Sequence, residues 1–86
     1  MENMKVLKAM WKAIEEYGIN AASVKNKPNC WLDAYDWTAM TGEKITSSRL
    51  TSMYKAGLID RAKDKAYFGN DRFHYFPTTT PDNSWN

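Results

Sequence analysis

The chain has 86 residues, of which 43% are hydrophobic and 26% are charged, and 12 Lys and Arg against 10 Asp and Glu give a net charge of +2. A chain of this length forms one small domain with a single core, which excludes large multi-step enzymes. The aromatic share of 14% excludes a disordered chain. Cys30 is the only cysteine, so the sequence excludes an internal disulfide and favours a reducing, cytoplasmic location.

Residues 4–17 predict an amphipathic first helix. Its apolar residues recur at spacings of three and four and are Leu7, Met10, Trp11, Ile14 and Tyr17. Lysines and glutamates interrupt them, so we expect neither a signal peptide nor a membrane-spanning segment. Gly18 suits the left-handed position that ends a helix, with Ile19 as the apolar residue after it. Residues 20–28 are polar and predict a connecting loop.

A second helix is expected over residues 30–41. Asn29 is the predicted N-cap, and Asp33 would lie in the first turn, where a negative charge complements the helix dipole. The predicted apolar face consists of Trp31, Ala34, Tyr35, Thr38 and Ala39. Gly42 is expected to end this helix.

The third predicted helix has clear start and stop signals. Thr46 is its expected N-cap, and Ile45 and Leu50 have the spacing of a hydrophobic staple. Gly57 is expected at the left-handed C′ position, followed by the apolar Leu58.

The segment after this helix predicts a β-hairpin. Gly69-Asn70-Asp71 is a turn signal between two extended arms, and alternating residues from Arg72 to Tyr75 indicate a strand with one covered face. Pro77 would end that strand. We therefore expect one domain over residues 1–78 and a flexible tail over residues 79–86.

Short motifs in the second half resemble the winged helix-turn-helix family of bacterial regulators and small bacteriophage proteins. These motifs are Thr41-Gly42, Ser48-Arg49-Leu50 and Ala56-Gly57-Leu58-Ile59. The resemblance covers residues 4–78. It implies an α+β, mainly α fold: a three-helix winged helix-turn-helix domain with a C-terminal two-stranded β-hairpin wing.

The resemblance also implies sequence-specific binding of double-stranded DNA by a small transcription regulator, with the third helix in the major groove and the wing on the backbone. The expected DNA-binding residues are Lys44, Thr46, Ser47, Ser48, Arg49, Thr51, Ser52, Lys55, Lys63, Lys65, Asn70 and Arg72. Residues 44–72 carry a net charge of +4, whereas residues 31–43 carry −3. The alternative interpretation of the hydroxyl-rich helix is a merely solvated face.

Catalysis finds little support in the residues. His74 is the only histidine and has no suitably placed nucleophile nearby, while Asp33 and Asp36 have no second acidic cluster to complete a metal site. We therefore expect no enzyme, no cofactor and no metal. The hairpin aromatics could stack on bases, but closing the core is the preferred interpretation.

A second functional hypothesis uses the same fold as a protein–protein interaction module, such as a small phage-encoded modulator of a host protein. The low net charge and the many aromatic residues favour it. The first helix and Trp85 also suggest a possible homodimer.

Overall fold

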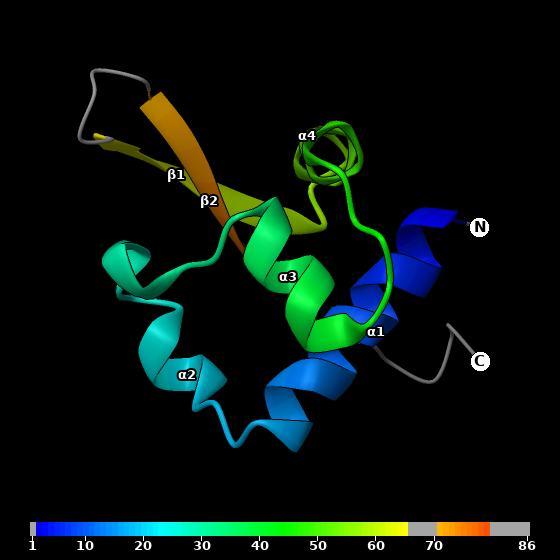
Figure 1. The fold of residues 1–86 in the computed structure, drawn as a ribbon. Helices are drawn as coiled ribbons and strands as arrows, with labels where there is room; N and C mark the ends of the chain where they lie inside the picture. Colours follow the sequence, from blue (N-terminus) through cyan, green and yellow to red (C-terminus); the bar gives the residue numbers. More distant parts are fainter. Residues whose placement is uncertain (1, 66–70, 80–86) are drawn as a thin grey trace.

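The computed structural model describes residues 2–65 and 71–79, with backbone alone at residues 2, 64, 65, 71 and 72. The elements in chain order are α1 (Glu2–Glu16), α2 (Ala21–Val24), the 3-10 helix η1 (Pro28–Cys30), α3 (Ala34–Thr41), α4 (Ser47–Lys55), β1 (Ile59–Lys65) and β2 (Asp71–Pro77) (Figure 1). The chain is therefore of the α+β class and mainly helical. Its described part holds four α-helices, one more than expected.

The first helix follows the predicted pattern except at its end. Leu7, Met10 and Ile14 of α1 are buried, whereas Tyr17 is 61% exposed, so the expectation that Tyr17 belongs to the apolar face is wrong. Gly18 has a φ of 66°, and the Ile19 N–H donates to the Ile14 carbonyl at 3.0 Å. This is the predicted left-handed helix ending.

The segment between α1 and α3 differs from the predicted loop and helix. The Asn20 side chain caps the short helix α2, which lies where a loop was expected, and η1 follows at the predicted start of the second helix. The next helix begins at Ala34, not Cys30, and Asp33 is its N-cap in place of Asn29: the Asp33 carboxylate accepts a hydrogen bond from the Asp36 N–H at 2.8 Å. A carboxylate at this position satisfies a free N–H and stabilises the start at residue 34.

The later start changes which side of α3 is buried. Trp37 is fully buried, although it was not expected on the apolar face, and Tyr35, which was expected there, is 80% exposed. Ala39 is also exposed. Trp31 precedes α3 and reaches the core from an extended segment.

A side-chain hydroxyl fixes the turn between α3 and α4. The Thr38 hydroxyl accepts a hydrogen bond from the Ile45 N–H at 2.9 Å and donates one to the Ile45 carbonyl at 3.0 Å. Gly42 ends α3 with a φ of 73°, as predicted. Because Ile45 is buried, these contacts hold the start of α4 at a fixed place relative to α3.

Helix α4 has the predicted start and end. The Thr46 hydroxyl caps it by accepting from the Arg49 N–H at 3.1 Å, and Leu50 and Met53 are fully buried. Gly57 has a φ of 78°, and the Leu58 N–H donates to the Met53 carbonyl at 3.0 Å. Both ends therefore follow from local sequence signals.

The two strands form the predicted antiparallel hairpin, in which Ile59 pairs with Pro77 and Lys65 with Asp71. The predicted turn residues Gly69 and Asn70 lie outside the described residues. Leu32 extends the pairing on the other side of β2: its N–H donates to the Tyr75 carbonyl at 3.2 Å and its carbonyl accepts from the Tyr75 N–H at 2.7 Å. This bridge ties the segment before α3 to β2.

Both faces of β2 are covered near its end, which corrects the expectation of one covered face. Tyr75 is 2% exposed and Phe76 is 1% exposed, although consecutive side chains of a strand point to opposite faces. The Phe76 ring lies 6.5 Å from Trp11, 6.5 Å from Trp31 and 6.1 Å from Trp37, measured between ring centroids. Phe76 thus lies among three tryptophans.

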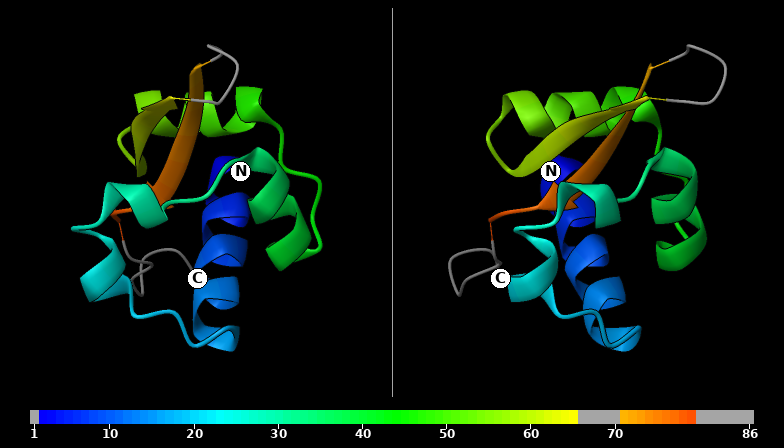
Figure 2. Two further views of the ribbon diagram at one scale, coloured as in Figure 1. Left: turned by 60° about the vertical axis from the view of Figure 1, so that its left-hand side comes forward. Right: turned by 90° about the vertical axis from the view of Figure 1, so that its left-hand side faces the viewer.

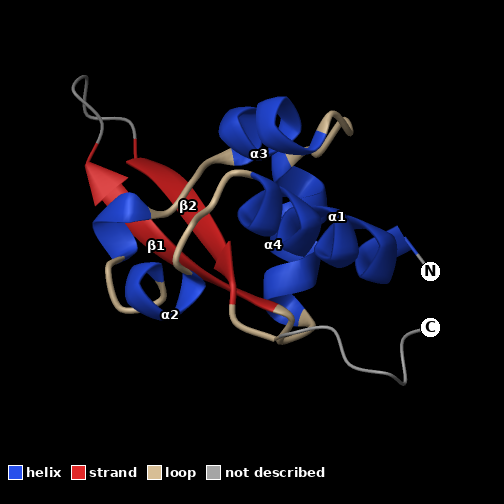
Figure 3. Ribbon diagram, turned by 90° about the horizontal axis from the view of Figure 1, so that it is seen from below, coloured by secondary structure: helices blue, strands red, loops and turns tan. Residues whose placement is uncertain are grey.

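In Figure 3 the helices α1, α3 and α4 lie to one side of the hairpin, and the views of Figure 2 show the strands running beside α4. Helix α4 contacts β1 as well as α1, so it lies between the helical part and the hairpin. The Trp11 indole N–H donates to the Thr79 carbonyl at 2.8 Å, and the Thr79 hydroxyl donates to the Gly57 carbonyl at 3.2 Å. Thr79, the first residue of the expected tail, therefore contacts the domain.

Candidate nucleic-acid interface

One side of α4 faces solvent and carries short polar side chains with one cation. Ser48, Ser52 and Lys55 are exposed, as is Ser47 at the first turn. Leu50 and Met53 occupy the opposite side, which fixes the helix orientation. Hydroxyls can donate and accept hydrogen bonds at base edges or phosphates, and Lys55 can bind phosphate.

Two hydroxyl groups of the expected DNA-binding site also make contacts with other residues of the protein. Thr46 is exposed, but its oxygen accepts the capping hydrogen bond from the Arg49 N–H. Thr51 is half-buried, and its hydroxyl lies 3.4 Å from the Tyr75 hydroxyl. Thr51 therefore lies at the margin of the solvent-facing side of α4, next to the hairpin.

Arg49 lies on the flank of α4 that faces α1. Its Nη1 donates to the Asn3 side-chain oxygen at 2.8 Å, and the residue is half-buried. This contact joins the first turns of α1 and α4. It holds the guanidinium to one side of the hydroxyl-bearing surface.

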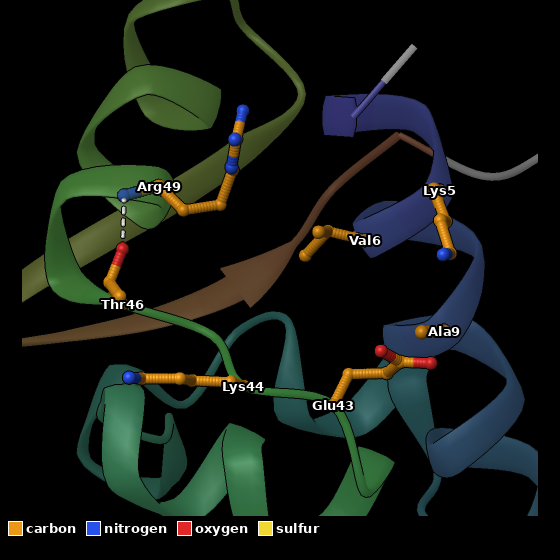
Figure 4. A pocket seen from close by; sticks show the side chains of 7 residues that line it. All are labelled: Lys5, Val6, Ala9, Glu43, Lys44, Thr46 and Arg49. Atoms are coloured by element: carbon orange, nitrogen blue, oxygen red, sulfur yellow. Dashed lines mark hydrogen bonds between the residues drawn. The ribbon is translucent and has the colours of Figure 1, made fainter.

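Arg49 also lines a shallow depression of about 200 Å³ between α1 and the start of α4 (Figure 4). The other lining residues are Lys5, Val6, Ala9, Glu43, Lys44 and Thr46. In Figure 4 the Lys44 and Arg49 side chains extend in different directions, and the Glu43 carboxylate lies near Ala9. The depression therefore combines three cations with one carboxylate but does not gather the cations around one point.

The hairpin contributes two described cations on the strand face that carries Ile59. Arg61 pairs with Tyr75 and Lys63 with Phe73 in the register of the sheet. Lys63 is exposed. The side chains of Lys65 and Arg72, and all of Asn70, lie outside the described residues, so the structure does not place these three expected contacts.

Arg61 was not among the expected site residues. Its guanidinium carbon lies 4.2 Å from the centroid of the Tyr54 ring and 4.1 Å from that of Phe73. Tyr54 is seven positions before Arg61 and Phe73 twelve positions after it, on two other elements. No local spacing rule joins these three residues. A correct strand register would have indicated one of the two contacts, because Phe73 is the diagonal cross-strand neighbour of Arg61.

Positive charge dominates the part of the chain that forms α4 and β1. From residue 44 to residue 63 there are five cations, Lys44, Arg49, Lys55, Arg61 and Lys63, and one acidic residue, Asp60. Asp60 pairs with Phe76 and therefore lies on the strand face opposite to Arg61 and Lys63. The face of β1 that meets α4 thus carries Arg61 and Lys63, and Asp60 lies on the other face.

Within residues 2–65 and 71–79, no group of three or more His, Cys, Asp or Glu is placed to hold a metal ion. No helix of this described part is long and apolar enough to cross a membrane.

The comparisons with known proteins identify no relative: no family model, no curated protein and no solved structure matches the chain.

Proposed function

We propose that the chain is a double-stranded DNA-binding module of the winged helix-turn-helix type, in which α4 enters the major groove and the hairpin lies along the backbone. The observation that carries this proposal is the composition of the exposed side of α4. Ser48, Ser52 and Lys55 face solvent there, with no bulky or acidic side chain among them. A helix bearing only short hydroxyls and a lysine can approach base edges closely.

The order of the elements and the contacts that hold them together support the proposal. The Thr38 contacts with Ile45 hold α3 and α4 as a unit, and the Leu32–Tyr75 bridge ties this unit to the hairpin. A rigid helix pair followed by a hairpin presents the exposed side of α4 and the cationic strand face in one orientation. Such preorganisation lowers the entropy cost of binding.

Titration of a fluorescent random-sequence duplex between about 50 and 200 mM salt tests the proposal. We expect binding to weaken steeply with salt. Lys55→Gln should flatten the dependence of log affinity on log salt by about one unit, because one phosphate contact is lost. Lys12→Gln is the matched control, since Lys12 is an exposed lysine in the later half of α1, whereas α4 meets α1 at Asn3.

Binding selection from a random duplex library then tests the sequence-specific part. Recovery of a common motif that Ser48→Ala and Ser52→Ala alter would support base reading by α4. Equal affinity for all duplexes would mean that the protein binds DNA without sequence specificity. No duplex binding at low salt would overturn the proposal.

An exposed aromatic ring favours a second candidate function, a protein–protein interaction module. Tyr35 of α3 is 80% exposed. Tyrosine is enriched in protein interfaces, where the ring is buried and the hydroxyl bonds to the partner. Loss of a copurifying protein on Tyr35→Ala, together with absent duplex binding, would favour this function over DNA binding.

A further inference from the structure

Arg61 joins three elements at the place where the hairpin meets α4. Its guanidinium lies between the Tyr54 ring of α4 and the Phe73 ring of β2, with centroid distances of 4.2 and 4.1 Å. Arg61 itself belongs to β1. Both ring contacts are cation–π interactions, and together they restrict the position of the guanidinium.

A second set of contacts reinforces this junction. The Phe73 and Tyr75 ring centroids are 6.4 Å apart, and the Tyr75 hydroxyl lies 3.4 Å from the Thr51 hydroxyl. Since Thr51 and Tyr54 are both on α4, the helix contacts the hairpin at two points one turn apart. The Arg61 charge therefore has a fixed position relative to both α4 and β2.

The edges of the guanidinium remain available for a ligand. Among the described residues its guanidinium N–H groups form no hydrogen bond or ion pair, and the residue is half-buried, so part of it reaches the surface. The two ring contacts supply no oxygen acceptor to the guanidinium N–H groups. Two parallel N–H donors match the two free oxygens of a phosphodiester.

We propose that Arg61 is the preorganised phosphate-binding group of this interface and holds one backbone phosphate of duplex DNA at the junction of α4 and the hairpin. The assignment rests on the proposed DNA-binding function and deepens it. Because the side chain is immobilised before binding, it contributes without a large loss of rotamer entropy. The bound phosphate also sets how α4 lies in the groove.

The same duplex titration tests this assignment with charge-preserving and charge-removing variants. Arg61→Gln should flatten the salt dependence by about one unit, whereas Lys12→Gln should not change it. Arg61→Lys keeps the charge but loses the fork of donors, so we expect an unchanged salt dependence and an affinity about threefold to tenfold weaker.

Variants of Tyr54 and Phe73 distinguish the effect of holding Arg61 in place from the effect of its charge. Tyr54→Leu and Phe73→Leu should each weaken binding about threefold at unchanged salt dependence, because the arginine is released but still present. Tyr54→Phe and Phe73→Tyr keep the rings and should bind like the wild type. Circular dichroism and thermal unfolding show whether each variant is folded at the temperature of the titration.

Two failures are distinguishable in these experiments. Suppose that the wild type binds duplex. If Arg61→Lys then has the same affinity as the wild type, or if Arg61→Gln has the same salt dependence as Lys12→Gln, the assignment of Arg61 is wrong and the DNA-binding function stands. If the wild type does not bind duplex at low salt, the proposed function fails and the assignment fails with it.

Discussion

At the scale of single residues, Tyr75 and Phe76 connect distant parts of the chain. The Tyr75 carbonyl accepts hydrogen bonds from the Leu32 N–H and, at 3.0 Å, from the Trp37 indole N–H. Phe76 lies among three tryptophans. The buried Tyr75 carbonyl has two donors, and the buried Phe76 ring has three aromatic neighbours. Substitutions that disturb this packing are therefore expected to destabilise the fold.

We expect Phe76→Ala to lower the free energy of unfolding by about 3–5 kcal/mol, because it opens a cavity among the tryptophans. Tyr35→Ala is the matched control: Tyr35 is 80% exposed, so its truncation should change stability by less than about 0.5 kcal/mol. Urea denaturation followed by tryptophan fluorescence measures both. Similar losses in the two variants would contradict the burial of Phe76.

At the scale of elements, the sequence predicted those features whose signals are local. Thr46 and Gly57 bound α4, and both ends of that helix lie where the capping signals placed them. The second helix was predicted too long because Asn29 was taken as its N-cap and Trp31 was assigned to its apolar face. Trp31 is instead buried from an extended segment, where its ring stacks on that of Phe76, forty-five positions later.

The candidate interface also has one part that the sequence predicts and another that it does not. The exposure of Ser48, Ser52 and Lys55 follows from the helical period once Leu50 and Met53 are known to face inward. The partners of Arg49 and Arg61 do not follow, because Asn3, Tyr54 and Phe73 come from other elements. Side-chain contacts between elements depend on packing geometry that no local pattern contains.

The C-terminal end of α4 gives a test of backbone conformation alone. Gly57 has a φ of 78°, and a Cβ built there would meet nothing within 4 Å. Gly57→Ala should therefore cost about 1–2 kcal/mol through the left-handed backbone without a steric clash. Gly57→Asn should cost less, because asparagine tolerates this conformation better, and chemical denaturation of both variants would reveal the difference. An alanine variant as stable as the wild type would contradict this ending.

The start of α4 gives the complementary test. Thr46→Ala removes the oxygen that accepts from the Arg49 N–H, and we expect a loss of about 0.5–2 kcal/mol in thermal or urea unfolding. Thr46→Ser keeps the oxygen and should retain most of the stability. If both variants lose the same amount, the threonine methyl group and not the cap is responsible.

At the scale of the whole molecule, the described elements share one core. Residues of α1, α3, α4 and both strands belong to a single buried cluster, and Trp31 joins it from the segment after η1. Helix α2 has no buried residue. The core should therefore unfold as one unit, while α2 can open separately.

Amide hydrogen exchange tests this difference. The Tyr75 N–H, which donates to the Leu32 carbonyl at 2.7 Å, should exchange only through global unfolding. The Lys27 N–H, which donates to the Val24 carbonyl at 2.9 Å next to α2, should exchange through local opening and hence faster. Equal protection of the two amides would mean that α2 and the core unfold together.

The bridge between Leu32 and Tyr75 also bears on how the chain folds during its synthesis. Trp31 and Trp37 emerge from the ribosome long before Phe76, the ring on which they pack. The helices can form locally, but their apolar sides stay uncovered until residues 75–79 have left the exit tunnel. The core is therefore expected to form only after β2 has left the ribosome, because Phe76 supplies the ring on which both tryptophans pack.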